Sequence, residues 1–160
     1  MQYAVSDIHG CYDKYIQLLH RINLRPTDTL YVLGDIIDRG PDGLKILLDI
    51  LEDLTVYEET EAGGREYVLV HAGLGGFSPK KALDDYQLEE LILSRPEPGQ
   101  DYFKDRYLVY GHTPTPYYTG VRPEDARIFR EDMLIGIDCG CESGGPLGCI
   151  CLDTLEEIYV

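Results

Sequence analysis

Short apolar segments that end on an aspartate or a histidine beside a glycine are the feature of this chain that most restricts its fold. Asp7-Ile8-His9-Gly10 follows the first such segment, and Gly34-Asp35 follows the next. Two later apolar segments end in the same way, on His71 and on His112. Because the strands of an open α/β sheet gather ligand groups at their carboxyl ends, this pattern predicts an α/β fold with a polar site at one sheet edge.

The helical and turn signals between these segments support the same fold class. A helix over Asp13–Ile22 separates the first two strands, and this order predicts a parallel or mixed sheet. Further helices are expected from Gly43 to about Asp53 and from Leu83 to Leu93, and the glycine-rich joint Ala62–Arg65 predicts a hairpin. The expected strands are Gln2–Ser6, Leu30–Gly34, Thr55–Glu61, Glu66–His71, Tyr107–Tyr110, Leu134–Asp138, Gly148–Leu152 and Glu157–Val160.

The size and charge of the chain restrict its partners. At 160 residues it is expected to form a single domain, and a net charge of −15 argues against nucleic acid as a ligand. A chain this acidic that binds phosphate needs local positive potential, which divalent cations and a few arginines supply. No apolar run is long enough to span a membrane and no signal peptide is visible, so a cytoplasmic location is expected. The sequence does not indicate an oligomeric state.

The cysteines allow two interpretations. Four of the five cysteines form the pairs Cys139/Cys141 and Cys149/Cys151. Four thiolates could bind zinc or an iron cluster, although C-x-C spacing is less diagnostic than C-x-x-C. Residues two apart on a strand share a face, so the thiols could equally be small buried apolar groups, which is the interpretation we favour.

Five polar side chains at strand ends form a candidate metal centre. They are Asp7, His9, Asp35, His71 and His112. Mixed carboxylate and imidazole ligands suit Mn, Fe, Zn or Co better than Ca or Mg. Asp35 is placed to bridge two ions, and a pair of ions can activate water and hold a phosphoryl group for in-line attack.

These motifs resemble those of the PPP-type metallophosphoesterases, which include serine/threonine protein phosphatases and symmetrical dinucleoside-tetraphosphate hydrolases. The matching segments are Asp7–Gly10, Gly34–Gly40, His71–Gly73 and Gly111–Thr113. The resemblance implies an αββα sandwich of mixed sheets with flanking helices. It also implies one ion held by Asp7, His9 and Asp35, a second held by Asp35, His71 and His112, and a catalytic role for Asp38, Arg39 and Arg95. The two arginines would bind the phosphate. Manganese is the first expectation for both ions.

One family motif is absent. The family has a Gly-Asn-His-Glu or Gly-Asn-His-Asp segment before the strand that ends on His71, but the only asparagine of this chain is Asn23. One ligand of the second ion and the histidine acid would then be missing, and Asp38 would have no histidine to orient. We hypothesise that a segment is missing from this numbering near residues 46–53, since the motifs on both sides are intact.

The resemblance leaves three functions open. The first is a metal-dependent phosphatase that hydrolyses phosphomonoesters, in particular phosphoserine or phosphothreonine in a protein or peptide, by means of a hydroxide held by the ions. The second is a symmetrical dinucleoside-tetraphosphate hydrolase, for which Tyr117 and Tyr118 are candidate base-stacking residues. The third is a non-catalytic metal-binding module, which applies if the 160 residues are the complete protein.

Overall fold

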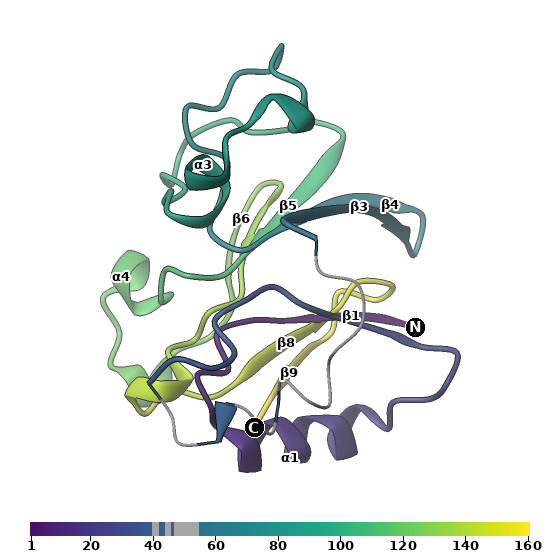
Figure 1. The fold of residues 1–160 in the computed structure, drawn as a ribbon, viewed down its shortest axis with the longest axis vertical. Coiled ribbons are helices and arrows are strands. Elements are labelled where there is room, and N and C mark those ends of the chain that lie inside the picture. Colours follow the sequence, from purple (N-terminus) through teal and green to yellow (C-terminus); the bar gives the residue numbers. More distant parts are fainter. Residues whose placement is uncertain (40–41, 44–45, 47–54) are drawn as a thin grey trace.

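The computed structural model of the chain describes residues 1–39, 42, 43, 46 and 55–160. Two β-sheets lie face to face, with α1 (Tyr12–Ile22) on the outer side of one sheet and α3 (Leu88–Ile92) on the outer side of the other (Figure 1). The αββα arrangement expected from the sequence is therefore confirmed. Most of the helix expected over 43–53, and most of the suspected gap near 46–53, lie outside the described residues.

The first sheet has the strand order β2-β1-β8-β9. β1 (Gln2–Val5) pairs with β2 (Thr29–Val32) in parallel, as the strand, helix, strand order predicts. β8 (Gly148–Cys151) pairs with β1 and with β9 (Glu157–Tyr159), antiparallel in both cases. Among the described strands, β2 pairs with β1 alone.

The second sheet has the strand order β3-β4-β5-β7-β6. β3 (Tyr57–Ala62) and β4 (Arg65–Val70) form the expected hairpin, and both turn residues, Gly63 and Gly64, have the positive φ that a tight two-residue turn requires. β5 lies parallel to β4 and to β7, and β6 closes the edge as a strand that the sequence did not predict. The bounds of these three strands are Arg106–Tyr110, Leu134–Gly136 and Phe129–Glu131, in the order named.

The helix expected over Leu83–Leu93 is wrong as one continuous element. The segment forms a 3₁₀ turn at Leu83–Asp85 and then α3. Tyr86 and Gln87 between them have extended backbone, and Gln87 begins α3 through a capping box with Glu90. The other short helical elements are α4 (Pro116–Thr119) and the 3₁₀ turns Pro123–Asp125 and Cys141–Ser143.

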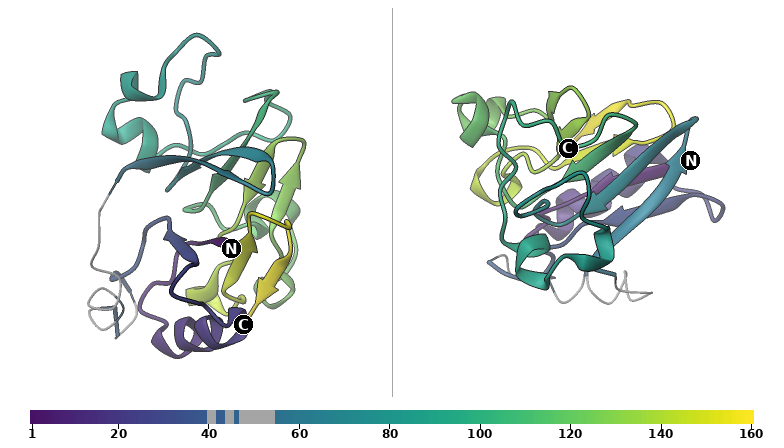
Figure 2. Two further views of the ribbon diagram at one scale, coloured as in Figure 1. Left: turned by 90° about the vertical axis from the view of Figure 1, so that its right-hand side faces the viewer. Right: turned by 90° about the horizontal axis from the view of Figure 1, so that it is seen from above.

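Alternate side chains of the strands pack on opposite faces of each sheet. Ala4, Leu69 and Val109 pack between the sheets, whereas Val5 packs toward α1 and Val68 toward the outer side of the second sheet. Figure 2 shows the same two layers from the side and from above. The strand ends that carry polar groups are thereby fixed by apolar packing on both faces. Within the described residues no helix has the length and apolar character needed to cross a bilayer.

The cysteines behave as buried apolar groups. Cys139 packs between the sheets, and Cys141, Cys149 and Cys151 pack on the α1 side of the first sheet. All five cysteines are free thiols, and burial raises the pKa of Cys139 to about 12. In the part of the chain that the structure describes, no group of candidate metal ligands contains a thiol.

Candidate metal centre

The five predicted ligands converge where the two sheets meet. Asp7 and His9 follow β1, Asp35 follows β2, and His71 and His112 follow the parallel strands β4 and β5. Backbone bonds join the first two loops, from His9 N to Asp35 O (2.8 Å) and from Asp7 N to Gly34 O (3.2 Å). The two sheets are joined at the same point, because His112 N donates to Asp7 Oδ2 at 2.9 Å.

The backbone at this centre is strained. Asp7, His9, Asp35 and His112 all have left-handed conformation, with φ of 53°, 46°, 45° and 63°. A residue other than glycine held there costs about 1–3 kcal/mol, and it persists only where surrounding contacts determine it. Four of the five expected ligands therefore occupy positions whose geometry the fold imposes at some cost in stability.

The first group of ligands is Asp7, His9 and Asp35. His9 Nδ1 lies 2.8 Å from Asp38 Oδ1, and since a carboxylate oxygen accepts, Nδ1 carries the proton. His9 Nε2 then presents its lone pair to Asp7 Oδ1 (3.9 Å) and to Asp35 Oδ2 (3.8 Å). Asp38 therefore orients a histidine after all, which corrects the expectation that it has none to orient.

The second group is Asp35, His71 and His112. His71 Nδ1 donates to the backbone carbonyl of Leu33 at 3.0 Å, so His71 Nε2 also presents a lone pair. That atom lies 3.6 Å from Asp35 Oδ1 and 3.2 Å from His112 Nδ1. The pKa of His112 is lowered by burial first and then by His71, which keeps its imidazole neutral and able to bind a metal.

Both groups have the donor set of a cation site. Each brings three candidate ligand atoms within 4.8 Å of one another, and Asp35 belongs to both. In the first group these atoms are acceptors that face one another, and Asp7 Oδ1 is buried without a hydrogen-bond partner. Facing acceptors repel unless a cation lies between them. The residues present fit divalent transition metals, since imidazole and carboxylate ligands are mixed.

Two glycines allow the close approaches on which this centre depends. A Cβ at Gly34 would lie 2.5 Å from His71 Nδ1, and a Cβ at Gly111 would lie 2.2 Å from Asp7 Oδ2. Glycine is therefore required at these two positions, because any side chain there would clash with a candidate ligand.

Comparison with known proteins finds a family match over the N-terminal part of the chain. Residues 3–71, which include four of the five candidate ligands, match the family described as calcineurin-like phosphoesterase. Over these residues the chain is similar to calcineurin-like phosphoesterases. Similar curated proteins are symmetrical bis(5'-nucleosyl)-tetraphosphatases from Photorhabdus laumondii (39% identity over 85 residues, 51% of this chain and 30% of that protein) and Citrobacter koseri (48% over 46 residues, 28% and 16%). The chain thus covers less than a third of either relative.

Solved structures share the fold of this chain. A candidate diadenosine tetraphosphatase has a TM-score of 0.72 at 19% identity, over 99% of this chain and 92% of that chain. A Saccharomyces cerevisiae serine/threonine phosphatase similar to human PP5 has a TM-score of 0.65 at 15% identity, over 92% and 71% of the two chains. At these identities the comparison establishes the fold alone.

The two arginines expected to bind phosphate lie near different ligand groups. Arg39 donates to Glu142 Oε1 and lies beside Asp38, the carboxylate that holds His9. Arg95 lies with its guanidinium 5.8 Å from the centre of the Tyr117 ring, and its charge contributes to the low pKa of His112, after burial and His71. Arg39 is thus near the first group and Arg95 near the second.

Two acidic residues near the centre, Asp138 and Glu142, were not among the site residues predicted from the sequence. Asp138 follows β7 and is 4% exposed, and burial, followed by the charge of Asp7, raises its pKa to about 8. Glu142 reaches Arg39 from the 3₁₀ turn at Cys141–Ser143. No spacing rule in the sequence links residue 142 to residue 39.

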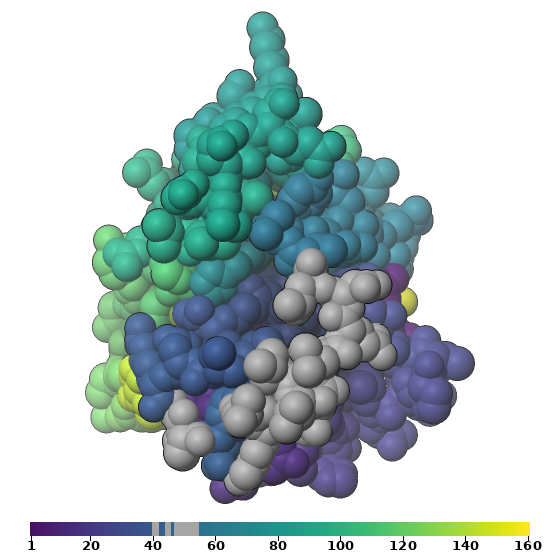
Figure 3. Space-filling model, in the orientation of Figure 1, coloured from purple at the N-terminus to yellow at the C-terminus, as the bar shows by residue number. Residues whose placement is uncertain are grey.

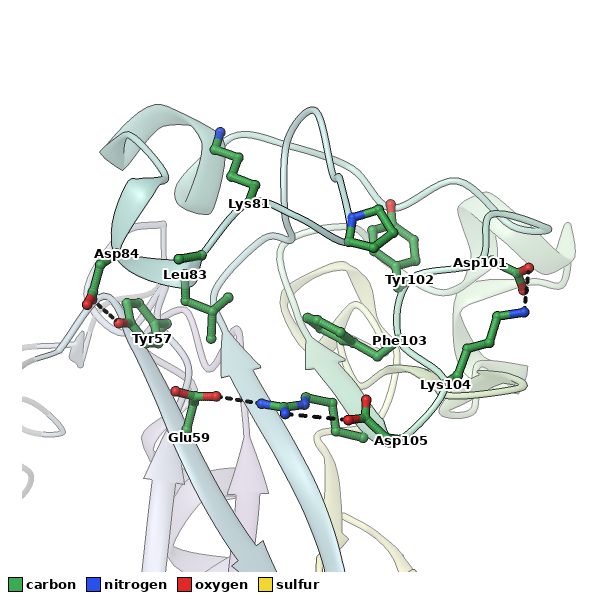
Figure 4. Close-up of a pocket in the computed structure, with 13 residues that line it drawn as sticks. Tyr57, Glu59, Lys81, Leu83, Asp84, Asp101, Tyr102, Phe103, Lys104 and Asp105 are labelled. Atoms are coloured by element: carbon green, nitrogen blue, oxygen red, sulfur yellow. Dashed lines mark hydrogen bonds and ion pairs between the residues drawn. The ribbon is translucent and has the colours of Figure 1, made fainter.

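A cavity of about 730 Å³ lies on the outer face of the second sheet, and it contains none of the expected ligands. Figure 4 shows Tyr57, Leu83 and Phe103 around it, with charged side chains at its rim. Lys104 pairs with Asp101, and Arg106 pairs with Glu59. Because these rim charges are paired with each other, the converging ligands between the sheets are the better candidate for the reactive centre.

Proposed function

We propose that this domain hydrolyses a dinucleoside polyphosphate with the aid of two divalent transition-metal ions, Mn²⁺ first, with Fe, Zn or Co as alternatives. The observation that carries the proposal is the position of Asp35, whose two carboxylate oxygens face different ligand groups. That arrangement suits a shared ligand between two ions. When bound, such ions supply Lewis acidity and lower the pKa of water.

The residues of the chain would bind the ions, orient one of the ligands and bind the phosphate. Asp7, His9 and Asp35 would hold one ion, and Asp35, His71 and His112 the other. Asp38 would keep the proton on His9 Nδ1, so that Nε2 stays available as a ligand. Arg39 and Arg95 would donate to phosphate oxygens, for which a planar guanidinium is well suited.

The chemistry of the leaving group favours a polyphosphate over a phosphoserine. The histidine that protonates the leaving oxygen in the family is absent from this sequence, which has no asparagine-histidine pair. A serine alkoxide leaves poorly without a proton, whereas a nucleotide phosphate is the anion of a much stronger acid. Cleavage between phosphates therefore depends less on the missing group.

An exposed aromatic ring beside Arg95 supports a nucleotide ligand. Tyr117 is 70% exposed, while Tyr118 stacks on Phe129 with ring centres 5.0 Å apart. The two candidate stacking residues thus differ, since Tyr118 packs on Phe129 of the sheet, whereas Tyr117 is largely exposed to solvent next to Arg95. A base that stacks there would leave its phosphates near Arg95 and His112.

The test compares three substrates on the Mn²⁺-loaded protein: a dinucleoside tetraphosphate, a phosphoserine peptide and a small aryl phosphate. We expect the first to be cleaved with the highest kcat/KM and chelation to abolish activity. Tyr117→Ala should raise KM for the dinucleotide roughly fivefold or more, since one stacked base contributes about 1–3 kcal/mol. Tyr117→Phe is the matched control and should be nearly silent.

Other outcomes of this comparison are equally informative. A higher kcat/KM on the phosphopeptide would support the phosphomonoesterase instead. Metal binding without turnover of any substrate would support the non-catalytic module, and the intact mass of the native protein then shows whether a segment near residues 46–53 is missing. A cytoplasmic site of action is part of the proposal.

A further inference from the structure

The side chain of Arg39 is engaged by carboxylates of the chain itself. Its Nη1 donates to Glu142 Oε1 at 2.6 Å, and its Nε lies 3.5 Å from Asp38 Oδ2. The Arg39 side chain is nevertheless 61% exposed, so a ligand from solvent can reach it. Figure 3 shows the segment that includes Arg39, coloured blue, at the surface of the molecule. A guanidinium group in contact with solvent is therefore already bound to an anion.

The partner of Arg39 is held in place from several sides. Ser143 Oγ donates to the same Glu142 oxygen at 2.8 Å. The turn that carries Glu142 is fixed by Lys14 of α1, whose Nζ donates to Cys141 O and to Gly145 O at 3.2 and 2.6 Å. The pKa of Glu142 is lowered, first by the Ser143 hydrogen bond and, against some desolvation, by Arg39, so it is ionised at neutral pH. The contact is thus made by a positioned carboxylate.

A carboxylate and a phosphate compete for the same donors of a guanidinium. Both bind its planar N–H fork, frequently in a bidentate manner. With Glu142 on Nη1 and Asp38 beside Nε, the two paired donors needed for a bidentate phosphate contact are not both free. The charge of Arg39 is also largely offset by these neighbours, so it attracts an approaching phosphate less.

Arg95 differs from Arg39 in this respect. Within the described part of the chain no ion pair includes Arg95, and the contact recorded for its guanidinium is the Tyr117 ring. A substrate phosphate can bind Arg95 without displacing anything. A substrate therefore meets free N–H donors on Arg95 and donors on Arg39 that already bind carboxylates.

We propose that Glu142 is a specificity-determining residue that occupies Arg39 as an internal competitor and is displaced by substrate phosphate. The inference rests on the proposed function and specifies its substrate class. A chain of several phosphates brings more charge and binds Arg95 as well, so it displaces Glu142 more readily than a single phosphate does. Glu142 thereby disfavours monoesters relative to polyphosphates.

The test is the affinity of the Mn²⁺-loaded protein for inorganic phosphate, measured by calorimetry. Glu142→Gln keeps the shape of the side chain but removes its charge, and it should tighten phosphate binding roughly two- to fivefold, as expected for loss of an exposed ion pair. The KM for an aryl phosphate should fall by a similar factor, and that for a dinucleoside tetraphosphate should change less. Glu124→Gln, which removes an equal charge beside Arg122, is the matched control.

A double variant isolates the contact. In an Arg39→Ala background, Glu142→Gln should change phosphate affinity no more than the control does. Equal or weaker phosphate binding by the single variant Glu142→Gln overturns the proposal, because Glu142 would then support Arg39 or play no part. Phosphate binding is read without turnover, so this outcome is distinct from a failure of the proposed enzymatic function. Glu142→Asp, which keeps the charge but shortens the reach, gives an intermediate affinity if the proposal is right.

Discussion

The two ligand groups share Asp35 but differ in charge and burial. The first adds a carboxylate and an imidazole, Asp7 and His9, that are 1% and 5% exposed. The second adds two imidazoles, His71 and His112, which are both partly exposed. One group is therefore a buried anionic cage, and the other is a more open and less charged surface.

This difference predicts unequal affinities for metal. In the first group, a cation relieves the repulsion between facing acceptors and satisfies Asp7 Oδ1, which has no other partner. In the second group, the Nδ1 of His71 already donates to a backbone carbonyl. This group contains one carboxylate instead of two, so a cation neutralises less negative charge there. We expect the first ion to bind more tightly than the second.

The largest effect should come from the residue that the two groups share. Asp35→Asn removes one ligand from both ions, so bound Mn²⁺ should fall from two equivalents to less than one, and turnover of an aryl phosphate by about 10³-fold. Bound metal is measured after dialysis and turnover at saturating Mn²⁺.

Asp132→Asn is the matched control for this variant. Asp132 is exposed and, like Asp35, has left-handed backbone, with φ of 48° against 45°. The control should keep both ions and full activity. If Asp35→Asn keeps two equivalents of Mn²⁺, the shared-ligand geometry is wrong, and so is the comparison built on it.

A smaller effect should separate the two groups. Asp38 orients His9 of the first group, and loss of such a supporting partner typically costs about 10- to 100-fold in metal affinity. Asp38→Asn should therefore weaken the tighter class of Mn²⁺ sites by about tenfold and leave the weaker class nearly unchanged. Competition with a fluorescent chelator measures both classes. A shift confined to the weaker class would reverse the assignment.

The positions of these groups were more predictable than their contacts. Strand ends followed by polar residues were sufficient to place Asp7 and Asp35 at one edge of a sheet, because apolar runs specify strands and parallel strands align their carboxyl ends. They did not show that His112 comes from a second sheet. The left-handed backbone conformation of these residues could not be predicted, because no sequence pattern marks an aspartate or histidine that adopts it. The Arg39–Glu142 pair joins residues 103 positions apart and depends on the tertiary fold.

The errors in secondary structure have local causes. β6 is only three residues long and carries Arg130 and Glu131, so it shows neither an apolar run nor clear alternation. The 3₁₀ turn at Leu83–Asp85 and α3 are separated by the extended backbone of Tyr86 and Gln87, and α3 begins at the capping-box contact between Gln87 and Glu90. Helical periodicity alone could not reveal that contact.

The smallest expected effect concerns Asp138, whose pKa burial and then the charge of Asp7 raise to about 8. In metal-free protein the native state then holds a proton that the unfolded state has lost, so the free energy of unfolding decreases as pH rises from about 4 to 8. Asp138→Asn removes this term and can still accept the bond from Gly140 N. Relative to wild type, the variant should gain about 1 kcal/mol or more between pH 5 and pH 8, or about 2–4 °C in Tm.

The comparison of the two ligand groups makes this pH effect depend on metal. An ion in the first group compensates the charge of Asp7, so Mn²⁺ should reduce the advantage of Asp138→Asn at pH 8, while Asp132→Asn should show no such dependence. Thermal unfolding with and without chelator at both pH values provides the measurement. Parallel pH profiles for wild type and Asp138→Asn would mean that the negative charge of the first group does not raise the pKa of Asp138. The first group would then differ less from the second in its electrostatic effect than we infer.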